Sequence, residues 1–485
     1  MDNSESKKFY ITTTLPYVNA DPHIGFASEI VRADIIARYR RLLGDDIFFN
    51  TGTDEHGMKI YRKAQEQGID TQKYVDEYTK KFDDLKQALN LSYNSFTRTT
   101  DEYHIKSAQE FWKRCEAKGD IYKKNYSVKY CVGCELEKTE SELNDRGCCP
   151  DHPNLEIETI EEENYFFKWS NYEKKLLDFY EKNPDFVVPD FRFNEIKRFV
   201  ERGLQDFSIS RLKEKMPWGV PVPDDENHVM YVWFDALVNY VSSLGWPEDD
   251  DKFVEYWGTE ENRNAIQVAG KDNLRQQSAM WQAMLMSAGL PLSKQIYIFG
   301  FVNSEGQKMS KSLGNVVNPL DLVEEYGTDA VRYYIARHLN TFEDSDFTME
   351  KFKEIYNANL ANGLGNLVSR VMKMAETNLS EPVEIKPNTI PQEWKDYLEN
   401  FKFNETCDFV WKKIGELDFK IQETQPFKLV KNDKEKAIVI IKSLVVDLYT
   451  VGIMLNPIML ETSEKIKELI KQNKSPEKPL FLRKD

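Results

Sequence analysis

The sequence predicts an α/β protein in which a doubly wound parallel sheet is split by an insertion and followed by a helical bundle. Three observations lead to this fold class. Phe9 to Glu29 has the pattern of a strand, a turn and a helix, which is how a doubly wound sheet begins. Residues 131–152 contain two closely spaced pairs of potential metal ligands, one of two cysteines and one of a cysteine and a histidine. Helical patterns dominate from Leu320 onward, and no strand pattern returns after it.

Composition limits what the chain can be. Its 485 residues suffice for about three domains, and 41% apolar with 13% aromatic residues supply real cores. The net charge of −16 argues against broad, non-specific nucleic-acid binding, although a local basic patch can still bind RNA. No run of 18 apolar residues and no apolar signal segment occur, so we expect a cytoplasmic protein without a membrane span. Six cysteines, four of them clustered, favour a metal site over a disulfide framework.

The first strand, turn and helix carry two candidate site residues. Phe9 to Thr14 alternates and is rich in β-branched and aromatic residues, and proline and asparagine break the chain after it. His23 is expected at the first turn of the helix, where free backbone N–H groups attract phosphate. Gly25 lacks a side chain, so a flat base or ribose can approach the backbone there.

The second strand is expected at Asp46 to Thr51 and ends close to Asp54. A carboxylate at the carboxyl end of a strand suits an ammonium group, whereas the alternative is an Asp–Gly-rich turn without a ligand. Lys59 to Glu116 looks helical with a break near Asn90. On that helix Cys115 falls on the apolar face and His104 is expected at the surface.

The clustered cysteines predict a zinc site. Cys131 and Cys134 form one pair, Cys149 and His152 form a second pair, and fourteen residues separate the two pairs. Each pair forms a tight turn that points both donors at one ion, which suits tetrahedral zinc. Four protein ligands leave no position for a substrate, so the zinc would be structural. Chance thiols, a disulfide, and Cys148 in place of Cys149 are the alternatives.

Three further strands and one polar loop complete the predicted sheet. Strands are expected at Val229–Asp235, Ala265–Lys271 and Ile296–Val302. In the loop that follows, Lys308 and Lys311 can clamp a triphosphate and neutralise charge as it shifts toward pyrophosphate. The alternative for a lysine pair of this kind is a solvated basic loop.

The motifs on these elements resemble those of a known family. TLPYVNADPHIGF resembles the first signature of class I aminoacyl-tRNA synthetases, and Lys308 to Ser312, KMSKS, is identical to the second. TLPYVN and YVWFDAL narrow the resemblance to the methionyl-tRNA synthetase family, and it covers nearly the whole chain. It implies a Rossmann-like catalytic domain with a connective insertion. The expected boundaries are catalytic residues 1–117 and 228–348, with the KMSKS loop and stem-contact region in the second half, the zinc insertion at 118–227, and a helical anticodon-binding domain at 349–485.

The resemblance implies an activity and a set of site residues. The chain would activate L-methionine with ATP and Mg²⁺ to methionyl-adenylate and transfer it to tRNA(Met). His23, Lys308 and Lys311 would be catalytic. ATP would be bound by His23, Gly25, Asp272, Lys308, Lys311 and Ser312; methionine by Leu15, Tyr17, Asp54, Trp233, Ala236, Tyr240 and Gln277; and the anticodon by Asn366, Arg370 and Phe427. Since the chain stops at Asp485, without the dimerisation domain of some relatives, we expect a monomer.

Three positions depart from the family pattern. Phe26 stands where the family usually has a second histidine, and it cannot donate a hydrogen bond. Gln276-Gln277 replaces an aromatic–histidine pair beside the methionine pocket, which leaves selectivity less certain. Phe427 follows proline where tryptophan is usual, and phenylalanine can still stack on a base. The remaining alternatives are a class I synthetase for another amino acid, such as cysteine or a branched aliphatic one, and a non-catalytic tRNA-binding paralogue.

Overall fold

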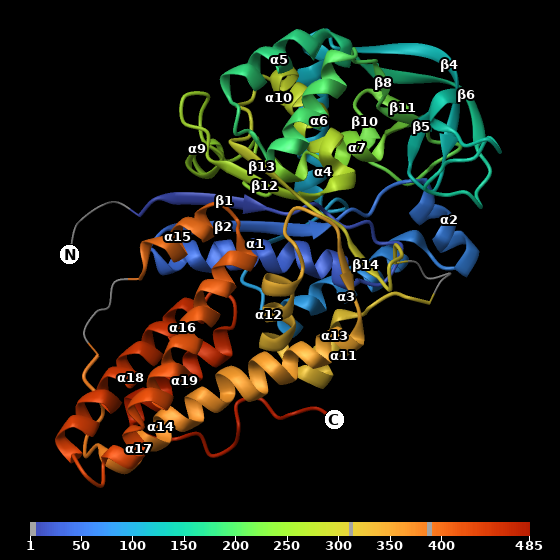
Figure 1. Cartoon of the computed structure of the whole chain (residues 1–485). Helices are drawn as coiled ribbons and strands as arrows, with labels where there is room; N and C mark the ends of the chain where they lie inside the picture. The colour runs from blue at the N-terminus through green and yellow to red at the C-terminus, as the bar shows by residue number, and fades with distance from the viewer. Residues whose placement is uncertain (1–5, 310–313, 386–389) are drawn as a thin grey trace. The chain divides into compact units, whose positions relative to one another are not determined.

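A computed structural model describes residues 6–309, 314–385 and 390–485 (Figure 1). The chain divides into two compact units. The first unit contains the residues up to Pro22, Asp45–Asp84 and Tyr93–Phe299. The second unit contains His23–Gly44, Leu85–Ser92 and Gly300–Asp485. Each unit therefore combines segments that lie far apart in the sequence.

The first unit is built on a six-stranded sheet of the expected doubly wound kind, in which every neighbouring pair of strands is parallel. The order is β3-β2-β1-β12-β13-β7, so the winding reverses between β1 and β12. Ile11, fully buried, pairs with Phe49 on one side and Ile266 on the other. Ligands of such sheets bind beyond the carboxyl ends of the strands at this reversal. The strands are β1 (Lys8–Thr12), β2 (Asp46–Thr53), β3 (Ser95–Arg98), β7 (Val187–Val188), β12 (Ala265–Gly270) and β13 (Gln295–Phe299).

The stretch between the two halves of this sheet carries two small antiparallel sheets. One has the order β5-β4-β6-β8 and the other β10-β11-β9. This stretch also supplies β7, the edge strand that pairs with β13 of the central sheet. The strands are β4 (Ile121–Cys131), β5 (Leu136–Lys138), β6 (Glu158–Phe167), β8 (Phe207–Ser208), β9 (Ser210–Leu212), β10 (Pro221–Val222) and β11 (Asp225–Met230).

Helices surround the sheets of the first unit and make up most of the second. The first unit contains α2 (Met58–Gln67), α4 (Glu102–Ala117), α5 (Glu173–Lys182), α6 (Asp190–Glu201), α7 (Val232–Ala236), α8 (Asn239–Ser242), α9 (Asp250–Trp257) and α10 (Trp281–Ala288), and α3 (Thr71–Ala88) runs from one unit into the other. The second contains α1 (Ile24–Leu42), α11 (Pro319–Tyr326), α12 (Thr328–His338), α13 (Met349–Ile355), α14 (Asn366–Asn378), α15 (Gln392–Glu399), α16 (Phe403–Thr424), α17 (Pro426–Leu429), α18 (Lys434–Leu455) and α19 (Leu460–Gln472).

Three predicted elements were wrong in part. The strand expected at Val229–Asp235 ends at Met230, and α7 begins at Val232. The break in the helical stretch near Asn90 contains β3. The absence of strands after Leu320 was also wrong, because β15 (Ser345–Phe347) pairs with β14 (Val302–Ser304) in the second unit. Strands this short carry almost no periodic signal, so their pairing is decided by tertiary contacts.

Within the second unit, a buried ion pair fixes α1, the helix that begins next to His23. Asp34 accepts hydrogen bonds from Arg38, at 2.7 Å, and from Ser92, and it forms an ion pair with Arg332 on α12 at 2.8 Å. Asp34 and Arg332 are both almost fully buried. Removing one partner of such a pair leaves an uncompensated charge, so α1 is held firmly against α12.

One helix of the second unit is apolar enough to cross a membrane by length and composition. Among the described residues this holds for α18 alone. Its stripe of Ile441, Leu444 and Leu448 is buried, and α14, α16 and α19 pack against it (Figure 1). These contacts identify α18 as the core helix of the bundle.

Candidate active site and metal centre

Two of the expected methionine-binding residues are joined through their backbones. Tyr17 and Asp54 follow β1 and β2, and they form a parallel bridge. The amide of Val18 donates to the Asp54 carbonyl at 3.2 Å, and the amide of Asp54 donates to the Pro16 carbonyl at 3.0 Å. The segments after the two strands therefore lie side by side at the carboxyl edge of the sheet, and β1 is also one of the two strands between which the winding reverses.

Asp54 is a buried carboxylate without a counter-ion. Its Oδ1 is buried and has no hydrogen-bond partner among the residues that the structure describes. Burial, followed by the charges of Asp235 and Glu135, raises the pKa of Asp54 well above its usual value. Its neighbour Glu55 differs, because both Glu55 oxygens accept hydrogen bonds from Arg98, at 2.7 and 2.9 Å. An unpaired buried carboxylate is costly, so this arrangement suits a cationic ligand such as an ammonium group.

Two histidines near this site form hydrogen bonds with Asp235 and not with Asp54. His56 Nδ1 donates to Asp235 Oδ2 at 2.6 Å, and His104 Nε2 donates to Asp235 Oδ1 at 2.8 Å. His104 Nδ1 then accepts from the Ser242 hydroxyl at 2.9 Å. The expectation that His104 lies at the surface was wrong, because it is fully buried in this network. A lone histidine on a helix gives no sequence signal for a partner more than a hundred residues away.

Aromatic side chains form one wall of the site. Tyr130, Tyr231 and Val232 make a buried cluster, and Tyr17 and Trp233 pack against it. Tyr130 belongs to β4 of the insertion. The insertion therefore contributes to this wall, although the residues expected to bind methionine all come from the catalytic segments 1–117 and 228–348. Of the other expected methionine residues, Ala236 and Tyr240 are buried and Leu15 is half-buried.

Gln276 and Gln277, which stand where the family usually has an aromatic–histidine pair, have different environments. Gln277 is buried, donates to the Tyr240 hydroxyl at 2.6 Å, and accepts from Gln267 at 3.3 Å. Gln276 lines the cavity described below, and its buried Oε1 has no hydrogen-bond partner among the described residues. Both lie in a π-helical turn, a feature that often marks functional sites. Gln277 thus orients Tyr240, while Gln276 offers the acceptor that the sequence prediction missed.

A cavity of about 800 Å³ opens within the first unit. Trp233 and Asp272, expected to contact methionine and the ATP ribose, both line it. Its lining also includes Arg198 and Arg202, at the end of α6, and neither has a carboxylate partner among the described residues. The sequence prediction missed these arginines, because their spacing is ordinary for an exposed helix face. Lys138, Lys271 and Arg275 add further positive charge against Glu142, Glu195 and Asp272.

The two signature motifs approach each other within the second unit. His23 is the N-cap of α1, and the amide of Ile24 donates to the Val317 carbonyl, beyond the KMSKS loop, at 2.9 Å. A Cβ placed on Gly25 would lie 2.8 Å from His23 Cε1 and 3.6 Å from Met309 Cε. The space beside Gly25 is therefore taken by the histidine ring. Lys308 lies in the loop after β14, whereas Lys311 and Ser312 are outside the described residues.

The protonation state of His23 follows from its contacts. Its Nδ1 accepts a hydrogen bond from the Gly25 amide at 3.1 Å, so the proton of the neutral ring is on Nε2. Burial lowers the pKa of His23 and favours this neutral form. The ring is thus prepared to donate an N–H at the start of a helix, where an anion is also attracted by free backbone amides.

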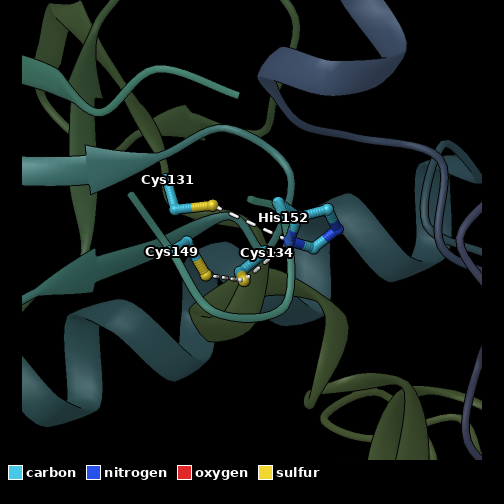
Figure 2. Close-up of side chains that lie close together, drawn as sticks. All are labelled: Cys131, Cys134, Cys149 and His152. Carbon is cyan, nitrogen blue, oxygen red and sulfur yellow. Dashed lines mark hydrogen bonds between the residues drawn. The ribbon is translucent and has the colours of Figure 1, made fainter. Parts of the chain in front are cut away.

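The four predicted metal ligands converge, and Figure 2 shows their side chains gathered around one point. Cys134 Sγ lies 3.2 Å from His152 Nδ1 and 3.4 Å from Cys149 Sγ, and all four donor atoms lie within 4.8 Å of one another. The cysteines are free thiols, so the disulfide alternative does not hold. Cys148 points elsewhere, with its Sγ 3.9 Å from the Arg146 carbonyl. Three sulfurs and one imidazole suit tetrahedral zinc.

The expected anticodon residues belong to the helices of the second unit. Asn366 is exposed at the start of α14, and Arg370, one turn later, pairs with Asp418 at 2.8 Å. Phe427 on α17 is 49% exposed. The sequence prediction missed Phe419, which follows Asp418 on α16 and is 60% exposed. A single apolar residue on a helical face is not distinguishable from a core position by spacing alone.

A nucleotide-binding type of sheet, a buried carboxyl group beyond the end of β2 without an ion-pair partner among the described residues, and a helix-start histidine near Met309 of the KMSKS motif agree with a class I aminoacyl-tRNA synthetase. Comparisons with known proteins support this class. The family described as tRNA synthetases class I (M) matches residues 9–156 and 154–372.

Relatives specify the class further. A methionine–tRNA ligase of Thermotoga maritima is 39% identical over 97% of this chain and 76% of its own length. That of Thermosynechococcus vestitus is 49% identical over 76% of this chain and 69% of its own. A solved structure of Mycobacterium tuberculosis methionyl-tRNA synthetase in complex with methionyl-adenylate has a TM-score of 0.88 at 36% identity, covering 95% of this chain and 93% of that one. The chain belongs to the methionine–tRNA ligase family, whose members are ligases that form aminoacyl-tRNA.

The convergence of the four metal ligands predicts about one zinc ion per chain in protein purified without chelators. Cys149→Ser should lose the metal and lower the melting temperature, because one of four bonds to the ion is removed. Cys148→Ser is the matched control and should keep the full metal content. Elemental analysis of the three proteins decides this. Wild-type protein without zinc, or loss of zinc from the control alone, would contradict it.

The raised pKa of Asp54 predicts that methionine binding releases protons. The free protein keeps Asp54 protonated at pH values where an exposed aspartate is ionised, and an ammonium ligand requires the carboxylate. Affinity should therefore increase by about tenfold per pH unit up to the raised pKa and then level off. Titration calorimetry in two buffers with different ionisation enthalpies measures the released protons. Asp54→Asn should bind more weakly and without this release; an identical pH profile in both proteins would refute the assignment.

Proposed function

We propose that this chain activates L-methionine with ATP and transfers it from the adenylate to tRNA(Met), using the residues that the motifs select. The observation that carries the proposal is the buried Asp54 side chain beside the aromatic wall, whose Oδ1 has no hydrogen-bond partner among the described residues. A carboxylate binds the α-amino group, and aromatic faces such as Trp233 suit the apolar, polarisable thioether of methionine. Leu15, Tyr17, Ala236 and Tyr240 complete this amino-acid site, with Gln277 acting through Tyr240.

In the first step the ionised methionine carboxylate attacks the α-phosphate of ATP, and pyrophosphate leaves. No general base is needed, so the protein acts by holding the reactants and stabilising charge. His23 donates its Nε2–H to the phosphates, and Lys308 and Lys311 neutralise the charge that moves onto pyrophosphate. Asp272 binds the ribose, and Gly25, which has no side chain, leaves room for the His23 ring. Mg²⁺ bound to the phosphates would supply further charge neutralisation.

Phe26 removes one donor from this step. A phenylalanine side chain makes no hydrogen bond to phosphate, so His23 and the loop lysines carry the transition-state contacts. Gln276 lines the cavity together with Trp233 and has a buried amide oxygen without a hydrogen-bond partner among the described residues, so it offers an additional polar contact there. These two changes distinguish this site from the family pattern.

In the second step a hydroxyl of the terminal adenosine of tRNA attacks the carbonyl of the adenylate and releases AMP. The tRNA end must enter the cavity that Trp233 and Asp272 share. Arg198 and Arg202 support this path, because unpaired guanidinium groups in a chain of net charge −16 suit phosphates. Asn366, Arg370 and Phe427 on the helical domain 349–485 would read the anticodon by hydrogen bonding and stacking.

The zinc module within 118–227 would stabilise the insertion through Cys131, Cys134, Cys149 and His152. Residues 1–117 and 228–348 would form the catalytic domain. A monomeric state and a cytoplasmic location stay predictions.

A methionine-dependent ATP–pyrophosphate exchange assay tests the proposed function. Methionine should support exchange, while cysteine, leucine, isoleucine and valine should do so at least about tenfold less efficiently. Exchange with another amino acid at higher efficiency would identify a synthetase of different specificity. No exchange with any of them would identify a non-catalytic paralogue.

The arginines of α6 predict a defect in transfer alone. Arg198→Gln combined with Arg202→Gln should lower kcat/KM for tRNA by about tenfold and reduce its salt dependence, because two phosphate contacts are lost. Exchange without tRNA should stay within about twofold of wild type. Arg192→Gln is the matched control, since Arg192 is paired with Glu195 on the same helix and does not line the cavity. Equal losses in exchange and transfer would contradict the assignment.

A further inference from the structure

Glu135 directly follows the metal ligand Cys134, yet its side chain lies in the first unit's amino-acid site. Its Oε1 accepts hydrogen bonds from the Tyr17 hydroxyl at 3.0 Å and from the Lys59 amide at 2.7 Å. Its Oε2 accepts a short hydrogen bond from the Tyr130 hydroxyl. Glu135 is 5% exposed, so these three donors replace water around a buried carboxylate.

The three donors come from separate parts of the site. Tyr17 follows β1 and is expected to contact methionine, and its backbone is bridged to that of Asp54. Lys59 is in the first turn of α2, directly after the segment that carries Asp54. Tyr130 is in the aromatic cluster against which Tyr17 and Trp233 pack. One carboxylate thus connects the ammonium-binding segment to the aromatic wall.

The surrounding backbone leaves little freedom for this arrangement. A Cβ on Gly57 would lie 2.1 Å from the Tyr17 hydroxyl oxygen and 3.3 Å from Glu135 Oε1, so only glycine fits there. Glu135 itself has a φ of +54°, a left-handed conformation that costs energy for a residue with a side chain. Lys59 Nζ donates to the Gly133 carbonyl at 3.2 Å, which gives the metal-binding turn a second contact with α2. Strain of this kind persists where several contacts fix the residue.

We propose that Glu135 is a positioning residue for the amino-acid site: the metal-binding turn delivers its carboxylate to hold the Tyr17 hydroxyl and the start of α2 in the geometry that methionine requires. The inference rests on the proposed function for the identity of the amino acid. It assigns to the turn at 131–135 a second task besides metal binding, which is to set the shape of the methionine site.

The experiment compares Glu135→Gln with wild type in the full-length, zinc-loaded protein. Glutamine keeps the size of the side chain and one acceptor but removes the charge and one acceptor oxygen. Methionine affinity, measured by equilibrium dialysis, should fall by about tenfold, because a charged buried hydrogen-bond acceptor is lost. KM for ATP in the exchange assay should stay within about twofold, and zinc content and melting temperature should stay close to those of wild type. Glu156→Gln, an exposed position in the same module, is the matched control and should change none of these.

A double-mutant cycle tests whether Glu135 acts through Tyr17. Tyr17→Phe should also weaken methionine binding, and adding Glu135→Gln to it should have little further effect, because the shared hydrogen bond is already absent. Three results would overturn the proposal: unchanged methionine affinity in Glu135→Gln, equal rises in the KM values for methionine and ATP, or loss of zinc together with stability. A wild-type protein that does not bind methionine would instead refute the proposed function.

Discussion

The amino-acid site depends on Asp54, a buried acidic side chain whose pKa is raised by burial and which has no ion-pair partner among the described residues. The donors near Asp54 are used elsewhere: Arg98 pairs with Glu55, and His56 and His104 both donate to Asp235. Asp54 is therefore left as the group whose charge a ligand must balance. Burying Asp54 costs free energy in the free protein, and an ammonium ligand offsets that cost when it binds. The affinity therefore depends on how the ends of β1 and β2 position Asp54 beside Tyr17.

The insertion contributes more to this site than its position between the two halves of the sheet indicates. It supplies Tyr130 to the aromatic wall and Glu135 to the Tyr17 hydroxyl. It also supplies Arg198 and Arg202, which line the cavity, and the edge strand β7 that pairs with β13. Since backbone pairing and buried hydrogen bonds attach the insertion to the central sheet within the first unit, the metal module is part of the scaffold of the amino-acid site.

The groups proposed to bind phosphate are ordered by a different set of contacts in the second unit. Asp34 and Arg332 hold α1 against α12, and the Ile24 amide is bound by the Val317 carbonyl. His23 is thereby fixed at the helix start with its Nδ1 already occupied by the Gly25 amide. The remaining Nε2–H needs no reorganisation to meet a phosphate oxygen, which is the preorganisation that charge-stabilising catalysis requires.

The sequence by itself determined the parts of this protein that depend on local pattern. The first two strands of the central sheet, the metal ligands with their fixed spacing, and the helix start at His23 were predicted, because each signal lies within a few residues, whereas the long strands β4 and β6 of the insertion were missed. The tertiary structure alone decided that Cys149 and not Cys148 joins the cluster, that His104 is buried against Asp235, and that Glu135 reaches Tyr17. These contacts join residues from separate segments of the chain, and such partners are chosen by burial and hydrogen-bond satisfaction in three dimensions.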